Sequence, residues 1–379
     1  MKNLKKNIIP IVGVIICSLI LISLSKFIFK GGFLADKYNK GMEYYKGEVV
    51  EVLEENLQED EFLENVQVGF QTVLVQLKDG PLKGQEYEIG NPVSRLYNIK
   101  VKEGTKVIVG CYESNGENVF TIFSYNRSNI IYILVAIFAL IVIIIGGVKG
   151  VKSLVSLIFT LVCCVYLMLP LLLKGVSPII AGILMAILSI TVTLLLVSGM
   201  NKKTFTAILG TVSGVVIAGI IAYVFGKLSY LSGITMEDAE SLMYIAEDTG
   251  LKITGLMFTG ILVASLGAVM DVAMSISSSI FEINSINDKV TFKELFKSAM
   301  NIGKDIIGTM TNTLILAFAG GSLSVLILIY SSSMPYNKMI NLDVLGTEVI
   351  QGLAGSIGIV LAVPITALIG CYLCKSNKS

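Results

Sequence analysis

Histidine and tryptophan are both absent from the 379 residues of this chain. Without histidine there can be no Ser–His dyad, no HExxH zinc motif and no histidine-ligated haem, which excludes many hydrolytic and metal-dependent sites. A phosphate loop of the form G-x-x-x-x-G-K-[ST] is also missing, which excludes ATP hydrolysis through that motif. An aspartyl intramembrane protease needs two buried carboxylates, and only Asp271 is a convincing candidate. We therefore expect a protein that is not an enzyme and that uses no cofactor or metal.

Charged residues are scarce as well. They make up 15% of the chain, against roughly 25% in soluble domains. Hydrophobic residues make up 54%, and the mean hydropathy is +0.78. The apolar residues lie in long runs, which indicates membrane spans rather than one soluble core. No basic face with interleaved aromatics stands out, so the expected partner is the lipid bilayer and not nucleic acid.

Cysteine is scarce in the soluble part of the chain, where a disulfide would be expected if there were one. Of the six cysteines, only Cys111 lies outside the apolar runs, so the soluble part of the chain cannot hold an internal disulfide. The pair Cys371 and Cys374 has the spacing of a metal or redox motif. Because no second pair accompanies it, we interpret it as apolar packing.

The chain divides into three predicted domains. Three lysines precede the apolar run Ile8–Phe29, which lacks a small-residue cleavage pattern, so residues 1–30 are predicted to be an uncleaved membrane anchor. Residues 31–129 carry ten Lys/Arg and sixteen Asp/Glu and form a soluble β-rich domain. Residues 130–375 are almost continuously apolar and are predicted to be a seven-helix membrane domain.

The soluble segment shows five runs of β-branched residues with alternating polarity, which is typical of short strands. Five such strands favour a small OB-like β-barrel. The acidic stretch Glu54–Glu64 cannot be a buried strand, and its charge argues against a polyanionic ligand. A structural or docking module is the main interpretation. The five runs are Lys46–Leu53, Thr72–Lys78, Gln85–Ile89, Lys106–Cys111 and Val119–Ser124.

With the anchor, we predict eight α-helical spans. If the N-terminus lies inside, thirteen lysines fall on the cytoplasmic side and four in the short outer loops after the third span. The sequence therefore predicts a multi-pass plasma-membrane protein with both termini cytoplasmic and residues 31–129 extracytoplasmic. An amphipathic segment is expected at Asn284–Lys304. The seven later spans are Ile130–Val148, Leu154–Leu173, Ile179–Met200, Phe205–Phe225, Ile253–Phe281, Asp305–Tyr330 and Glu348–Leu373.

Asp271 lies inside the apolar run Ile253–Phe281, where a carboxylate costs roughly 2.5–3.5 kcal/mol on insertion scales. We expect it to face the bundle interior, a cavity or a partner. Counting the helical rise places it at about the same depth as polar groups of the next two spans. Two other interpretations stay open: Asp271 ties helices together, or it lies at the cytoplasmic interface. The candidate ion or substrate site is Asp271, Thr309, Asn312, Thr313, Pro364 and Thr366.

Other polar and small residues have simpler interpretations. Asp305 and Glu348 are expected at helix starts, where their charge favours the positive end of the helix dipole. Gly352, Gly355 and Gly358, with the pair Gly320–Gly321, are expected to let helices approach closely, although hinge or broken-helix roles remain open.

Several strings resemble the YibE/F family of bacterial multi-span membrane proteins. They include GAVMDVAMSI at 267–276, GTMTNTLIL at 308–316, GSIG at 355–358 and VPIT at 363–366. The resemblance extends from Lys46 to Leu373. It implies an integral plasma-membrane protein of Gram-positive type. The family is largely uncharacterised, so the resemblance supplies neither an activity nor catalytic residues.

Two functions fit these patterns. In the first, a secondary transporter or permease, Asp271 couples to a proton or cation while Asn312 and Thr309 or Thr313 orient a small solute. An inverted pair of three-span halves is topologically allowed. In the second, a non-transporting assembly or sensory protein, the outer β domain binds an envelope partner. A homo-oligomer is compatible with either function.

Overall fold

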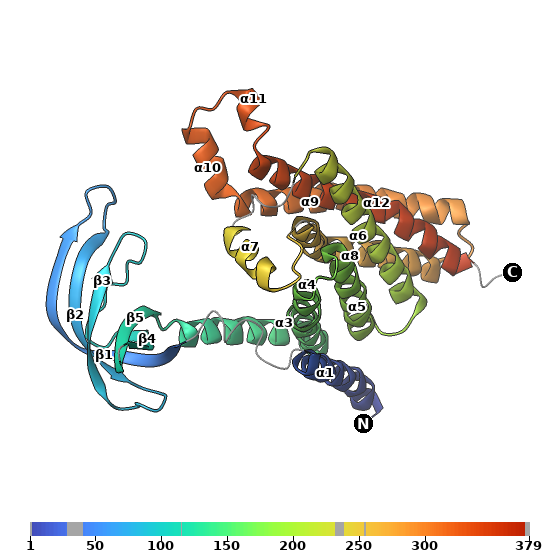
Figure 1. The fold of residues 1–379 in the computed structure, drawn as a ribbon. Helices are drawn as coiled ribbons and strands as arrows, with labels where there is room; N and C mark the ends of the chain where they lie inside the picture. The colour runs from blue at the N-terminus through green and yellow to red at the C-terminus, as the bar shows by residue number, and fades with distance from the viewer. Residues whose placement is uncertain (1, 29–40, 115, 232–238, 254, 376–379) are drawn as a thin grey trace. The chain divides into compact units, whose positions relative to one another are not determined.

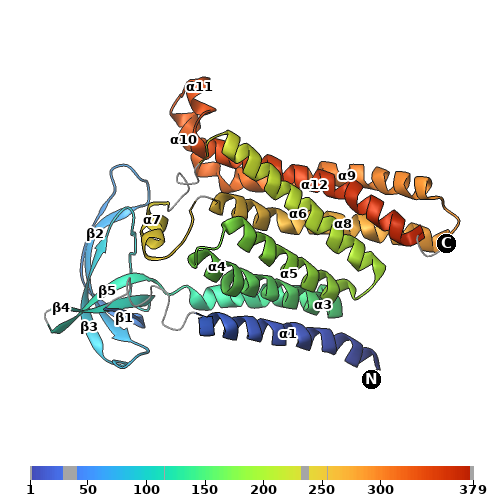
Figure 2. The same cartoon turned by 45° about the vertical axis from the view of Figure 1, so that its right-hand side comes forward.

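The computed structural model describes residues 2–28, 41–114, 116–231, 239–253 and 255–375. The expected junction between the anchor and the outer segment, at residues 29–40, lies outside these ranges. So do Glu237 and Asp238, two acidic residues between the predicted spans Phe205–Phe225 and Ile253–Phe281. Two compact units make up the fold: a β unit, Phe29–Ile141, and a helical unit, Met1–Ile28 with Val142–Ser379 (Figures 1 and 2).

The β unit is one antiparallel sheet of five strands in the order β3-β2-β1-β4-β5 (Figure 1). The long strand β1 lies at its centre and pairs with both β2 and β4. Alternating apolar side chains, among them Val49, Val75 and Val109, are buried on the inner face, as period-2 patterning requires. The strands are β1 (Met42–Glu59), β2 (Gln67–Leu77), β3 (Glu86–Val93), β4 (Lys106–Ser114) and β5 (Glu117–Tyr125).

The sheet curls into a half-barrel whose two edge strands approach each other. The rings of Tyr87 on β3 and Phe120 on β5 lie 4.0 Å apart between centroids. Inside the curl, a Cβ on Gly47 would lie 2.7 Å from a Val75 methyl and 2.9 Å from a Val109 methyl. The absent side chain of Gly47 therefore makes room for the side chains of the two neighbouring strands.

All five strands lie where the β-branched runs predicted them, but β1 continues six residues beyond Leu53, to Glu59. This corrects the expected strand end. The glutamates Glu54, Glu55 and Glu59 are exposed on the paired strand, so their charges remain in water. The acidic stretch was rightly predicted not to be a buried strand, but exposure did not prevent Glu54–Glu59 from pairing, and Asp60, just after β1, is buried.

The helical unit contains long apolar helices. Among the described residues, six helical segments are long and apolar enough to cross a membrane, or seven if the bent pair α9 and α10 counts as one span. The largest core cluster joins α5, α6, α8, α9 and α12, and a second includes residues of α1, α3 and α5. The long helices are α1 (Lys2–Ile28), α3 (Ser128–Cys163), α5 (Pro178–Ser198), α6 (Lys202–Leu228), α8 (Leu256–Ile286), α9 (Phe292–Gly321) and α12 (Asp343–Lys375).

Shorter helices connect or continue these. A π-helical turn, η1 (Cys164–Met168), and α4 (Leu169–Leu173) extend α3. A helix that was not expected, α7 (Ala239–Asp248), lies between the predicted spans Phe205–Phe225 and Ile253–Phe281. Beyond α9 follow α10 (Leu323–Ser331) and the single turn α11 (Tyr336–Met339).

A sharp turn interrupts α3 at Gly147, whose φ of 54° and ψ of −133° are not helical. A Cβ on Gly150 would collide with the carbonyl oxygen of Val142, eight residues earlier. In a straight helix these residues would be about 12 Å apart along the axis. The chain therefore folds back at Gly147, close to the predicted end of the span Ile130–Val148.

The boundary between α8 and α9 differs from the expected one. A capping box between Thr291 and Glu294 starts α9, which then runs without interruption through Asp305. The expected amphipathic segment is thus divided: Asn284–Ile286 ends α8, and Phe292–Lys304 shares α9 with the following span. Asp305 does not cap a helix start, because it lies 13 residues after Phe292, the first residue of α9.

Candidate functional site

Asp271 projects from a face of α8 that no other described part of the chain covers. The residues beside it, Met270 and Val272, pack into the core. Asp271 is exposed, and it shares its row with four small exposed residues, Gly260, Ala264, Gly267 and Ser275, at helical spacing. Within the described ranges no cation pairs with Asp271. We call this row the open face of α8.

The depth of Asp271 follows from a polar cluster at one end of the helical unit. The Lys375 ammonium donates to the Asn284 side chain at 2.8 Å and to the Asp288 carbonyl at 3.2 Å. Lys202 donates to the Leu373 carbonyl at 3.1 Å. Asp271 precedes Asn284 by 13 residues, or about 20 Å of helix. In a hydrocarbon layer about 30 Å thick, Asp271 would lie well away from this polar end.

The predicted site residues of α9 also face away from the core. Leu295, Ala299 and Gly303 form its buried face. Thr309 donates to the Ile306 carbonyl at 3.0 Å, and its neighbour one turn on donates to the Thr309 carbonyl at 2.9 Å. That neighbour is Thr313, and it is exposed, as are Thr309 and Asn312. The two hydroxyl protons are therefore used locally, while the Asn312 amide is left available.

The α12 residues lie elsewhere. Thr366 is fully buried, and its hydroxyl has no hydrogen-bond partner among the residues that the structure describes. A Cβ on Gly210 of α6 would collide with the Thr366 side chain, so Thr366 faces α6. Pro364 is half-buried. The structure thus places Thr366 against α6, and Asp271 and Asn312 on uncovered helix faces. Whether these residues bind a ligand stays a prediction.

Close glycine packing was expected on α12 and occurs at two of the named positions. A Cβ on Gly355 would lie 2.9 Å from Leu314 of α9, and one on Gly358 would lie 2.8 Å from a backbone oxygen of α6. By contrast, Gly320 and Gly321 have open space around them. They end α9 just before α10 begins, where the two helix axes differ by 65°. The glycine pair therefore marks a helix break.

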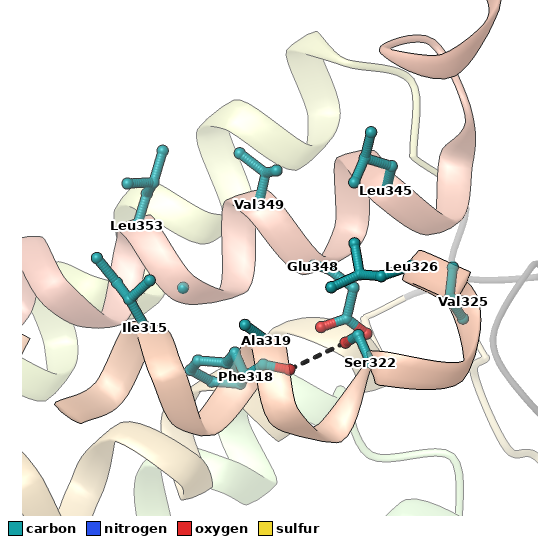
Figure 3. Close-up of a pocket in the computed structure, with 11 residues that line it drawn as sticks. Ile315, Phe318, Ala319, Ser322, Val325, Leu326, Leu345, Glu348, Val349 and Leu353 are labelled. Carbon is teal, nitrogen blue, oxygen red and sulfur yellow. Dashed lines mark hydrogen bonds between the residues drawn. The ribbon is translucent and has the colours of Figure 1, made fainter. Parts of the chain in front are cut away.

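A groove lies at this break and was missed in the sequence. It has a volume of about 240 Å³ between α9, α10 and the first half of α12, and Figure 3 shows Ile315 and Leu353 at one end of it. At the other end the Glu348 carboxylate points toward Ser322 (Figure 3). Glu348 was expected to cap a helix start, whereas it lies five residues inside α12. The signal that was present is Gly320–Gly321–Ser322 within an apolar run.

Comparisons with known proteins give one match. A family model described as YibE/F-like protein matches residues 134–376, about two thirds of the chain. No curated protein and no solved structure matches.

Proposed function

The chain belongs to the YibE/F-like family, and from this premise we propose that it is a plasma-membrane transporter or permease for a small solute or cation. The observation that carries the proposal is the Asp271 carboxylate, deep in an apolar helix and uncovered by its own chain. Leaving such a group in lipid costs about 2.5–3.5 kcal/mol. Water in a pathway, a bound cation or a proton would remove that cost.

The topology we propose has eight spans, both termini cytoplasmic and the β unit outside. The turn at Gly147 supports two crossings within Ser128–Leu173, a segment of 46 residues. As one straight helix it would be about 69 Å long, more than twice the apolar thickness of a bilayer. Lys202 and Lys375 lie at one end of the helical unit, which supports a common cytoplasmic side.

In the proposed mechanism, the open face of α8 lines the pathway. Its small residues leave room beside the helix, and Asp271 binds the coupling proton or cation. Asn312 on α9 supplies an amide for the solute. The break between α9 and α10 is the kind of discontinuity at which transporters change conformation.

The direct test is flux into proteoliposomes. Purified protein would be tested against imposed gradients of protons, sodium, potassium and magnesium, with a panel of amino acids, sugars and organic acids outside. We expect Asp271→Asn to reduce coupled flux at least tenfold and Asp271→Glu to retain part of it. Asp343→Asn removes an exposed carboxylate near the start of α12 and serves as the charge-matched control. Equal flux in wild type and Asp271→Asn would remove Asp271 from the mechanism.

A second function is favoured by a different observation. The loops at one end of the proposed OB-like β unit expose large apolar side chains: Phe62 is 76% exposed and Leu96 is 84% exposed. Arg95 bridges these loops, because its guanidinium pairs with Asp60 and stacks 4.8 Å from the Phe62 ring. An ordered apolar tip of this kind suits an envelope partner, as an assembly or sensory protein would require.

Photo-crosslinking from position 62 would separate the two functions. A single partner, captured in stoichiometric amount and lost in Leu96→Asp, would favour the assembly function if flux is absent. Normal flux in Leu96→Asp would favour transport.

A further inference from the structure

The groove beside the α9–α10 break combines an apolar wall with a single charge. Its lining is aliphatic or aromatic except for Ser322 and Glu348. Apolar cavities of about 150 Å³ already bind benzene, and this one is about 240 Å³. Among the residues that line it, Leu353 and Val349 are 52% and 43% exposed, so the groove opens to the surroundings of the helical unit.

The charge in the groove is not neutralised by the protein. Within the described part of the chain, no lysine or arginine pairs with Glu348. The Ser322 hydroxyl donates to the Phe318 carbonyl at 3.1 Å, which leaves its oxygen lone pairs free to accept (Figure 3). The carboxyl end of α9 and the amino end of α10 meet here, so their opposite dipole ends largely cancel. The net charge of this end of the groove is therefore that of Glu348.

From these features we propose that the groove binds an aliphatic ammonium compound. The hydrocarbon chain lies along Ile315, Phe318 and Leu353, and the ammonium donates to the Glu348 carboxylate and to the Ser322 oxygen. An ammonium carries three donors and no acceptor, which matches two acceptors and no donor on the protein side. An inorganic cation would use only one end of the groove, and an anionic amphiphile would be repelled by Glu348. The ligand is a free long-chain amine or the amine headgroup of a lipid.

The absence of tryptophan makes the test direct, because one introduced tryptophan is the sole indole in the protein. Leu353→Trp places the reporter in the groove, and Phe225→Trp on the exposed side of α6 reports general partitioning. The probes are dodecylamine and dodecanol with bromine atoms on the chain, which quench tryptophan fluorescence on contact. Full-length protein in detergent is titrated with each.

The main comparison is a cycle in which each of two ligands, the amine and the alcohol, is titrated into each of two proteins, one with Glu348 and one with Glu348→Gln. Glu348→Asp and Glu240→Gln are added as controls. In the Leu353→Trp background we expect saturable quenching by the amine, at least tenfold weaker binding of the alcohol, and at least tenfold weaker amine binding after Glu348→Gln. Glu348→Asp should restore part of the amine affinity. Glu240→Gln removes a carboxylate from α7 and should change nothing. Equal affinities for amine and alcohol, or no effect of Glu348→Gln, would overturn the proposal.

A second variant tests the apolar wall independently. Ala319→Leu adds side-chain volume and so reduces the space in the groove. It should weaken the binding of both ligands at least tenfold, while the melting temperature of the protein stays the same. Should Ala319→Leu fail to fold, Ala319→Val is the smaller substitution. Unchanged binding of both ligands to a folded variant would show that the hydrocarbon chains of the ligands lie elsewhere. That result would also overturn the proposal.

Brominated phospholipids in nanodiscs then identify the source of the amine. Stronger quenching of the Leu353→Trp reporter by a phosphatidylethanolamine than by a phosphatidylcholine indicates a lipid headgroup. Equal quenching by the two lipids, together with saturable dodecylamine binding, indicates a free amine. Neither result depends on transport, so this inference and the proposed function can fail separately.

Discussion

Gly214 of α6 and Gly358 of α12 face each other at backbone distance. A Cβ on Gly358 would lie 2.8 Å from the Gly214 carbonyl oxygen, and one on Gly214 would lie 3.0 Å from the Gly358 oxygen. The two helices therefore meet through their main chains, as small-residue contacts between membrane helices allow. This contact belongs to the largest core of the helical unit.

The first prediction concerns this contact. Gly358→Ala should destabilise the protein by about 1–3 kcal/mol, the usual cost of overpacking, despite the better helix propensity of alanine. Gly260→Ala, on α8, is the matched control because nothing lies within 4 Å of the new methyl group. It should be neutral or stabilising by up to about 1 kcal/mol. Thermal unfolding in one detergent compares the two, and equal melting temperatures would contradict the close contact.

The second prediction concerns Gly147. Its φ of 54° with ψ of −133° is a conformation that side chains disfavour, so Gly147→Ala should cost about 1–3 kcal/mol. The neighbouring Gly146→Ala is the control, since no atom lies within 4 Å of its added Cβ. The same melting assay applies. If Gly147→Ala and Gly146→Ala have the same melting temperature, the turn is not strained in the way the dihedral angles indicate.

The third prediction is a pH dependence in the β unit. The hydrogen bond from Arg95, with those from the Phe62 and Leu63 amides at 2.9 and 3.0 Å, lowers the pKa of the Asp60 carboxyl. Because the folded pKa is below the unfolded one, this contribution to stability is complete above roughly pH 3.9. It is lost as the pH falls through the folded value. Asp60→Asn removes this contribution of the carboxylate to stability at every pH.

Hydrogen exchange of residues 41–125 in the full chain checks this. At pH 7 the Asp60→Asn variant should exchange faster than wild type, and the difference should shrink as the pH falls below about 3.9. Glu61→Gln, at the exposed next residue, is the control. A difference that stays constant from pH 7 to pH 2.5 would mean that the carboxylate charge does not contribute.

The fourth prediction tests topology. Leu96→Cys in the β unit should react with a membrane-impermeant maleimide in intact cells. Met200→Cys, which is 90% exposed in the connection between α5 and α6, should react only after the membrane is opened. Wild type is the background control, because its Cys111 is buried. The reverse labelling pattern would invert the proposed orientation.

The β unit was predictable because its strands alternate between water and core, so the pattern marks both the strand and its buried face. The length of β1 was underestimated most, and β2 and β3 also extend beyond the predicted runs, to Gln67 and Val93. We expected the charged residues Glu54–Glu59 to end the strand. The hydrogen bonds of an antiparallel pair join main-chain groups only, so strand β1 continues through these residues while their side chains stay in water. The order of the strands could not be derived from the runs alone.

The apolar helices were predictable in approximate position more than in contacts. Eight spans were expected, whereas the described residues contain six long apolar helical segments, or seven if the bent pair α9 and α10 counts as one span. Lipid and neighbouring helices are both apolar, so the pattern does not tell a covered face from an uncovered one. Asp271 and Thr366 were expected on one site, but α6 covers Thr366 and none of the described helices covers Asp271. The groove at Glu348 depends on the 65° break, which a pair of glycines permits but does not dictate.

The reversal at Gly147 has a consequence for everything that follows it. If each arm of α3 traverses the bilayer, the chain returns to the compartment it left, and an even number of crossings separates the β unit from the start of α5. If the arms together make one passage, that number is odd, and every later loop changes compartment. The compartment in which each later loop lies thus depends on Gly147, whose backbone can turn where other residues would continue the helix.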